Sequence, residues 1–199
     1  DAAPAPARHD AERQAQQRRA GLDVQQHDKR QRDAQRPVEI LRDRPLLARP
    51  VEPAGQGGVS AALVVKITQD IPVYRMWNGP GDVNAQGNTN RLGGWWSYDA
   101  PHGPVDGYRV AYEICRDWNK LKWVATCTLK AGAVVAIGPG QSVSAQTCGD
   151  PTGAEQYPAN PVDWQTFVNK PWTRTSELSC PPESADYQAD PLDIAKPKP

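Results

Sequence analysis

Every aromatic residue and every cysteine of this 199-residue chain lies at or beyond Tyr74. The seven Trp, six Tyr and single Phe residues are the side chains that bury the most apolar area, and residues 1–73 contain none of them. A segment without such side chains does not bury enough surface to offset the entropy lost on folding. The distribution therefore predicts one folded domain in the second part of the chain, preceded by a polar leader.

Composition divides the chain into three segments. Residues 1–58 are rich in Gln, Arg, Asp, Ala and Pro and end in Gly-Gln-Gly-Gly, which predicts a disordered leader with a hinge. Residues 59–180 hold the expected folded domain, and residues 181–199 form a Pro-rich tail that we expect to be loose. The opening Asp-Ala-Ala-Pro is typical of a mature exported protein whose signal peptide has been removed. No run approaches the roughly 18 apolar residues of a membrane span. The net charge of zero gives no indication of a nucleic-acid partner.

The four cysteines, Cys115, Cys127, Cys148 and Cys180, favour disulfides over a metal site. Their number is even, none belongs to a CxxC pair, and one His accompanies them in this part of the chain, so we expect no bound metal. Four cysteines allow three pairings, and the shortest loops favour Cys115–Cys127 with Cys148–Cys180. Disulfides form in oxidising compartments, which predicts a secreted or periplasmic protein.

Alternating apolar and β-branched runs predict a β-rich α+β domain with short helices, stapled by two disulfides. We expect strands at residues 61–67, 71–77, 95–98, 123–128, 133–137 and 163–168, and a short helix within residues 108–119. The chain lacks a phosphate-binding GxxxxGK[ST] loop, a GxGxxG turn after a strand, an HExxH zinc motif and a GxSxG nucleophile elbow. Several common enzyme classes are therefore set aside.

Two neighbouring motifs carry the strongest indication of chemistry. The first is Val73-Tyr-Arg-Met-Trp-Asn-Gly79, and the second is Gly93-Gly-Trp-Trp-Ser-Tyr-Asp-Ala-Pro101. An arginine inside an apolar strand is costly to bury without a partner, and a guanidinium group binds a phosphate or paired sugar hydroxyls well. The motifs predict an aromatic-walled cleft with one fixed cation, Arg75.

Together with the Tyr108-Arg109 pair, these motifs resemble bacterial ADP-ribosyltransferase toxins. The resemblance spans residues 73–109 and is greatest to the compact toxin domains of polymorphic secreted proteins, in the Arg–Ser–Glu class that includes pertussis-like toxins. It implies an enzyme with a split-sheet fold. Such an enzyme uses NAD as a co-substrate, cleaves it, and needs no metal. The acceptor of ADP-ribose would be an unknown macromolecule or water, and a delivery or immunity partner would accompany the toxin.

The resemblance also implies roles for individual residues. Arg75 would hold the nicotinamide ribose or a phosphate of NAD, and Ser97 would hold the scaffold of the site and the ribose. Trp95 and Trp96 would wall the nicotinamide pocket. A late carboxylate usually stabilises the oxocarbenium-like transition state. Here the late segment offers Gln165, favoured by its position on a strand, and Glu155, which carries charge but lies in a loop.

Other interpretations of the same residues stay open. A secreted binding module would stack sugars on a solvent-facing row of indoles, and the candidates are Trp77, Trp95, Trp118 and Trp123. A non-enzymatic envelope or secretion-associated protein would use the aromatic residues as core. Glu113 and Arg109 are spaced as a helical i,i+4 ion pair worth about 0.3–0.5 kcal/mol.

Overall fold

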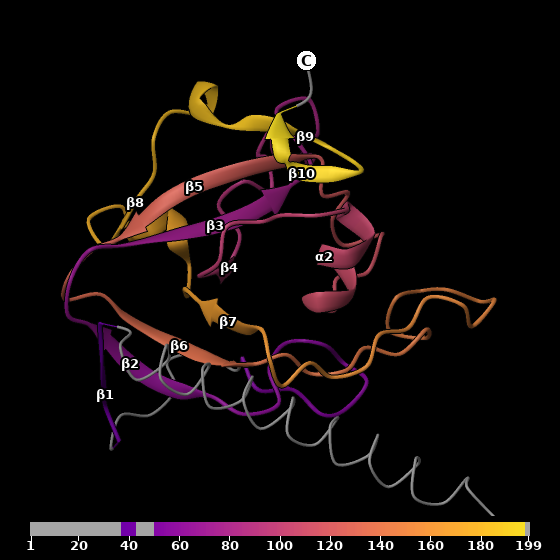
Figure 1. The fold of residues 1–199 in the computed structure, drawn as a ribbon, viewed down its shortest axis with the longest axis horizontal. Helices are drawn as coiled ribbons and strands as arrows, with labels where there is room; N and C mark the ends of the chain where they lie inside the picture. The colour runs from indigo at the N-terminus through magenta and orange to yellow at the C-terminus, as the bar shows by residue number, and fades with distance from the viewer. Residues whose placement is uncertain (1–36, 43–49, 198–199) are drawn as a thin grey trace, which may run out of the picture. The chain divides into compact units, whose positions relative to one another are not determined.

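The computed structural model describes residues 37–42 and 50–197 (Figure 1). The expected disordered leader lies largely outside the described residues, which exclude residues 1–36 and 43–49. The chain divides into two units, Asp1–Pro37 and Val38–Pro199, and every element below belongs to the second.

A single antiparallel sheet of ten strands forms the framework of this unit. Its strands follow the order β1-β2-β6-β7-β4-β3-β5-β9-β10, and β8 pairs with β5 beside this path. The strands are β1 (Val38–Ile40), β2 (Leu63–Ile67), β3 (Ile71–Trp77), β4 (Trp95–Ser97), β5 (Trp123–Leu129), β6 (Val134–Pro139), β7 (Trp164–Phe167), β8 (Leu178–Ser179), β9 (Tyr187–Asp190) and β10 (Asp193–Pro197). One α-helix, α2 (Val105–Ala111), and two short 3-10 turns, Pro171–Thr173 and Glu183–Ala185, complete the described elements.

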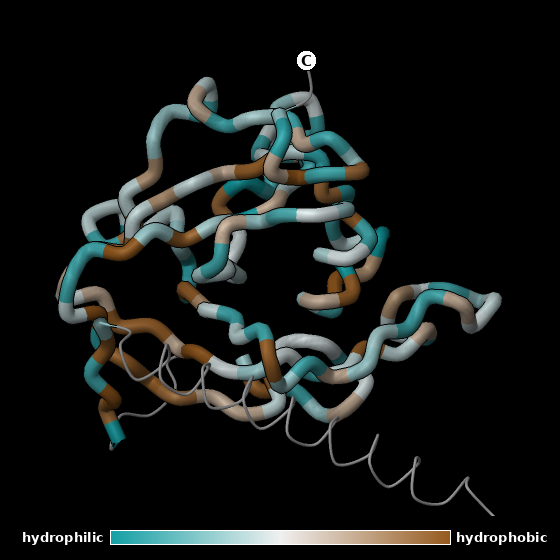
Figure 2. Tube along the Cα trace, viewed as in Figure 1, coloured by the Kyte–Doolittle hydropathy of each residue, from teal (hydrophilic) through white to brown (hydrophobic). Residues whose placement is uncertain are grey.

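Two short strands, β4 and β7, lie in the middle of the sheet between longer pairs (Figure 1). On one side, β3 and β5 pair along seven residues, from Ile71 opposite Leu129 to Trp77 opposite Trp123. On the other side, β2 pairs with β6, and Figure 2 shows the apolar stretches of these two strands next to each other. Strand β4 meets β3 at a single register position. Of the strand pairs in the sheet, β3 with β4 is therefore the least extensively paired.

The described residues form three apolar clusters, and the two larger ones pack against the sheet. The larger cluster joins β2, β3, β5 and β6, and Val65, Ile67 and Leu129 within it are fully buried. The smaller cluster packs Tyr108 of α2 against residues that include Ile194 of β10. Asp106 lies in the first turn of α2 and Arg109 in the last, the charge order that the helix dipole favours. This packing holds α2 over the end of β3.

The predicted strands from 61–67 to 163–168 correspond to β2 through β7. The helix expected within residues 108–119 instead begins at Val105 and ends at Ala111. The domain is β-rich, as expected. The tail from residue 181 is not loose, because β9 pairs with β5 and Ile194 of β10 is fully buried. This prediction gave the prolines more weight than the apolar residues between them.

The leader boundary at residue 58 also needs correction. Strand β1 lies before that boundary, yet it pairs with β2 and belongs to the sheet. The glycine segment interpreted as a hinge is bound to the fold, since the Gly57 amide donates to the Ser142 carbonyl at 2.9 Å. The Gln141 amide likewise donates to the Gly58 carbonyl at 3.0 Å.

Two disulfides are formed, Cys115–Cys148 and Cys127–Cys180, and they interleave along the chain. The predicted nearest-neighbour pairing is therefore wrong. The shortest-loop argument ignored the sheet: β8 pairs with the end of β5 and so brings Cys180 beside Cys127. The two bridges indicate an oxidising compartment outside the cytoplasm. Among the described residues, no helix is long and apolar enough to cross a membrane.

Candidate functional site

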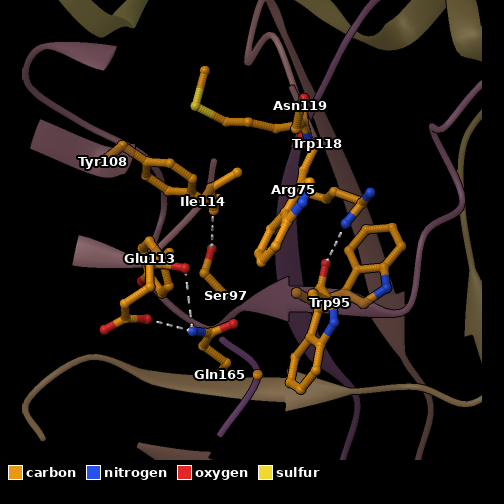
Figure 3. Close-up of a pocket in the computed structure, with 13 residues that line it drawn as sticks. Arg75, Trp95, Ser97, Tyr108, Glu113, Ile114, Trp118, Asn119 and Gln165 are labelled. Carbon is orange, nitrogen blue, oxygen red and sulfur yellow. Dashed lines mark hydrogen bonds between the residues drawn. The ribbon is translucent and has the colours of Figure 1, made fainter. Parts of the chain in front are cut away.

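A cleft of about 250 Å³ opens where β4 lies between β3 and β7 (Figure 3). The segment that follows α2 closes it on one side. Its lining combines one cation, one carboxyl group and several aromatic rings. The lining residues are Gly58, Arg75, Met76, Trp95, Trp96, Ser97, Tyr108, Tyr112, Glu113, Ile114, Trp118, Asn119 and Gln165.

Arg75 supplies the cation, from the middle of β3. Its Nε donates to the Asn90 carbonyl at 3.2 Å, and its Nη1 donates to the Trp95 carbonyl at 2.8 Å. Within the described part of the chain, no carboxylate forms an ion pair with it. Burial lowers the pKa of Arg75 to about 10, so the group stays positive at neutral pH. The guanidinium group is thus fixed by neutral carbonyls and keeps its charge available for an anion.

Gly93 makes room for this arginine. A Cβ atom at position 93 would lie 2.1 Å from the Arg75 Nη2 atom, so any larger residue would displace the guanidinium group. The second glycine of the motif, Gly94, faces the ring of Phe167 in the same way, at 2.9 Å. The Gly-Gly pair before β4 therefore lets this segment approach Arg75 of β3 and Phe167 of β7 closely enough to form the wall of the cleft.

Ser97 ends β4 and holds the neighbouring strands together. Its hydroxyl lies 3.3 Å from the Tyr74 carbonyl and 3.0 Å from the Asp99 carbonyl, both acceptors, and it receives a hydrogen bond from the Tyr108 hydroxyl at 3.5 Å. The side chain is almost fully buried. Burial raises the pKa of Tyr108, so its phenol is a donor at neutral pH. These contacts suit a scaffolding hydroxyl better than a nucleophile.

Three indoles line the cleft from different directions. Trp96 belongs to the core and donates from Nε1 to the Gly93 carbonyl at 2.8 Å. Trp95 is half-buried, and its ring lies 4.9 Å from the ring of Phe167. Trp118 is 45% exposed, and its ring lies against Gly57, where a Cβ atom would approach to 3.0 Å. The cleft thus has a buried aromatic wall and an exposed aromatic rim.

Gln165 lies opposite Ser97 in the register between β4 and β7. Its Nε2 donates to Glu113 Oε2 at 3.0 Å and lies 3.4 Å from the Tyr112 carbonyl. Figure 3 shows the amide oxygen on the other side, toward Trp95. The side-chain NH₂ is therefore used within the protein, and the amide oxygen is left to accept a hydrogen bond from a ligand.

Glu113 is the functional candidate that the sequence analysis did not select for the cleft. It follows α2 with a φ of 48°, and 2% of its surface is exposed. Burial raises the pKa of its carboxyl group to about 9, and the negative charge of Asp163 acts in the same direction. The group is neutral at pH 7. Among the described residues, its Oε1 has no hydrogen-bond partner.

The expected helical ion pair between Glu113 and Arg109 does not form. The helix ends at Ala111, and the left-handed conformation of Glu113 turns its side chain to Gln165 instead. Arg109 donates from Nη1 to the Ile114 carbonyl at 2.9 Å. The i,i+4 spacing requires a helix that continues through residue 113, and this one does not.

The other late candidate, Glu155, does not line the cleft. Its Oε1 accepts hydrogen bonds from the Arg116 amide at 2.7 Å and from the Tyr157 hydroxyl at 3.0 Å. It therefore braces the loop that contains it. The cleft brings together Arg75, Trp95, Trp96, Ser97 and Gln165 from the predicted set and leaves Glu155 out.

The indole row required by a sugar-binding module is not present in the predicted form. Trp77 is fully buried, and its ring lies 6.2 Å from the ring of Trp123. Within the described ranges, no group of three or more His, Cys, Asp or Glu side chains is placed to hold a metal ion. Comparisons with protein-family models, with curated proteins and with solved structures found no match for this chain.

Proposed function

We propose that the cleft binds NAD and cleaves the bond between its nicotinamide and ribose. One observation carries the proposal: Arg75, which has no ion pair with the described residues, and the amide oxygen of Gln165, whose NH₂ group is bound to Glu113, line one aromatic-walled cleft. This set suits a ligand with a flat ring, hydroxyl groups and a phosphate. The sequence resemblance to ADP-ribosyltransferase toxins, and with it a split-sheet fold of that kind, is part of the same proposal.

Each wall of the cleft then has a role in binding. Arg75 pairs with the diphosphate, and Trp95 and Tyr112 enclose the nicotinamide ring. Gln165 accepts a hydrogen bond from a ribose hydroxyl. The volume of about 250 Å³ is below the range of about 300–1,000 Å³ that is typical of pockets for whole drug-sized ligands. The cleft therefore receives the nicotinamide riboside end, and the adenosine end extends past the exposed ring of Trp118.

The reaction breaks one bond and forms one. The electron pair of the glycosidic C–N bond leaves with the nicotinamide nitrogen, which neutralises its positive charge, and the ribose becomes oxocarbenium-like. Water then attacks the same carbon and loses a proton to solvent, so NAD and water give nicotinamide, ADP-ribose and a proton. Water is the favoured acceptor because the only carboxyl group of the lining, Glu113, is neutral at pH 7 and cannot deprotonate a protein side chain.

The full chain should be used in the test, because Gly58 lines the cleft and the preceding segment is bound to the fold. Incubation with NAD should release nicotinamide and free ADP-ribose, measured by chromatography. Arg75→Ala should reduce the release by about 100-fold or more, the size seen when a charge-stabilising group is removed. Arg116→Ala is the matched control, because the Arg116 side chain is exposed and lies outside the cleft lining.

Two other outcomes of this experiment separate the hypotheses. Nicotinamide release with ADP-ribose bound to an added acceptor would replace hydrolysis by transfer. Neither release nor NAD binding by calorimetry would overturn the proposal and favour a sugar-binding or non-enzymatic envelope protein. A secreted or periplasmic location is proposed with this activity, because both compartments maintain disulfides.

A further inference from the structure

The carboxyl group of Glu113 is enclosed in a way that a core residue does not require. It lies beneath the cleft, 98% buried, and no cation forms an ion pair with it among the described residues. Its Oε2 accepts from the Gln165 side-chain amide, and the Asn160 backbone amide also acts on the carboxyl group. Among the described residues, Oε1 has no hydrogen-bond partner. A buried polar atom without a partner destabilises the folded state. Glu113 therefore lowers the stability of the folded protein, and it does so at the cleft.

The backbone around Glu113 is arranged to admit this side chain. Gly140, which follows β6, faces the carboxyl group, and a Cβ atom there would lie 2.1 Å from Oε2 and 2.4 Å from Oε1. Gly140 does not have a positive φ, so its backbone conformation does not itself require glycine. The absent side chain at position 140 makes space for the carboxyl group of Glu113.

We propose that Glu113 is a positioning residue that acts through Gln165, by holding the amide so that its oxygen faces the ligand. The inference rests on the proposed NAD-cleaving function. An unrestrained glutamine amide can turn over and present NH₂ groups instead of an oxygen. Here Glu113 Oε2 and the Tyr112 carbonyl both accept from Nε2, which sets one orientation. The site then requires a hydrogen-bond donor on the ligand, as a ribose hydroxyl provides.

The test compares nicotinamide release by full-length Glu113→Leu, Glu113→Gln, Gln165→Ala and the double variant Glu113→Leu with Gln165→Ala. Glu113→Leu should lower kcat by about 10- to 100-fold, the scale on which outer partners affect a site. Its KM should change less than threefold. Glu113→Gln should recover activity to within about threefold of the wild type, because its amide oxygen can accept from Gln165. The double variant should be no slower than Gln165→Ala alone, since a residue acting through Gln165 has no effect without it.

A second measurement does not depend on activity. The side-chain NH₂ signals of Gln165, assigned by their absence in Gln165→Ala, should exchange slowly with solvent and shift in Glu113→Leu. Gly140→Ala should shift them in the same direction, while Gly81→Ala, in open space, should not. A wild-type protein that releases no nicotinamide would overturn the proposed function. Unshifted Gln165 signals in a folded Glu113→Leu protein, or additive losses in the double variant, would overturn the role of Glu113.

Discussion

Two regions of this domain hold an arginine inside the fold, Arg91 and Arg75, and the partners of the two guanidinium groups differ. Between the loop after β3 and the chain before β9, Arg91 donates from Nε and Nη2 to both oxygens of Asp186, at 2.6 and 2.8 Å. Hydrogen bonding to Asp186 raises the pKa of Arg91. In the cleft, Arg75 meets backbone carbonyls, and burial lowers its pKa to about 10.

The acids of the two regions differ in the same way. Asp186 is paired with Arg91, and their side chains are 2% and 10% exposed. Glu113 is buried as a neutral acid against an amide. In the first region, the ion pair joins two segments that are distant in the chain. In the cleft, Arg75 and Glu113 do not pair with each other. Arg109 is 3% exposed and also lacks an ion pair among the described residues, so an unpaired cation does not by itself indicate function. The cleft is assigned a function because its cation, Arg75, lines a cavity together with Glu113 and Gln165.

The largest expected effect comes from breaking the paired region. Arg91→Met leaves Asp186 buried without its cation, which should destabilise the protein by about 3–5 kcal/mol. Urea denaturation under non-reducing conditions would measure this loss. Adding Asp186→Leu to the same protein should recover part of it, because no uncompensated charge then remains. An Arg91→Met protein as stable as the wild type would remove the contrast between the two regions.

An effect of opposite sign, and at pH 7 of at most similar size, is expected in the cleft. Because the pKa of Glu113 is raised from 4.5 to about 9, folding takes up a proton between these values, and stability is lost as pH rises through that window. Glu113→Gln needs no proton. Its advantage over the wild type should be absent near pH 4 and should grow by up to about 1.4 kcal/mol per pH unit from pH 5 to pH 8. Parallel stability curves for the two proteins across this range would contradict a buried neutral acid.

Arg75→Met should change stability less than Arg91→Met does. It removes an unpaired buried charge, which favours folding, and leaves the carbonyls of Asn90 and Trp95 without a donor, which opposes it. We expect the two changes to offset each other to within about 1 kcal/mol. Thermal unfolding of the two methionine variants side by side gives the measurement. Equal losses would mean that Arg75 is as structural as Arg91.

The smallest effect on stability is expected at an exposed ion pair, with which the buried groups can be compared. The side chains of Arg116 and Asp106 are 61% and 72% exposed and lie 3.0 Å apart. Asp106→Asn should change the free energy of unfolding by less than about 0.5 kcal/mol, as for most exposed pairs. Urea denaturation in low and high salt would test this. A loss of several kcal/mol would show that the contribution of an ion pair to stability does not depend on its burial in this protein.

The parts that sequence could predict are those that depend on local pattern. Strands such as β3 and β5 follow from short-range apolar and β-branched runs, and Arg75 is conspicuous because it interrupts one of them. These signals lie within a few residues of each other, so no knowledge of the sheet was needed.

The parts that sequence could not predict depend on where the strands lie. Glu113 reaches Gln165 only because α2 ends two residues before it and β7 lies beside β4. Its spacing from Arg109 indicated a different partner. The cysteine pairing depends on β8 joining β5, a contact between residues about fifty positions apart. The pairing of β9 with β5 joins residues still farther apart in the chain, and the prolines of the β9 segment suggested a loose tail instead.

The interleaved bridges have a consequence for a protein exposed to proteases. A single backbone cut anywhere between Cys115 and Cys180 is spanned by at least one disulfide, because Cys115–Cys148 and Cys127–Cys180 overlap. The two fragments would stay covalently joined and would separate on a gel only after reduction. Loops in this stretch can therefore be nicked while the chain remains one molecule, and the cleft residues Arg75 and Gln165 stay in the same particle.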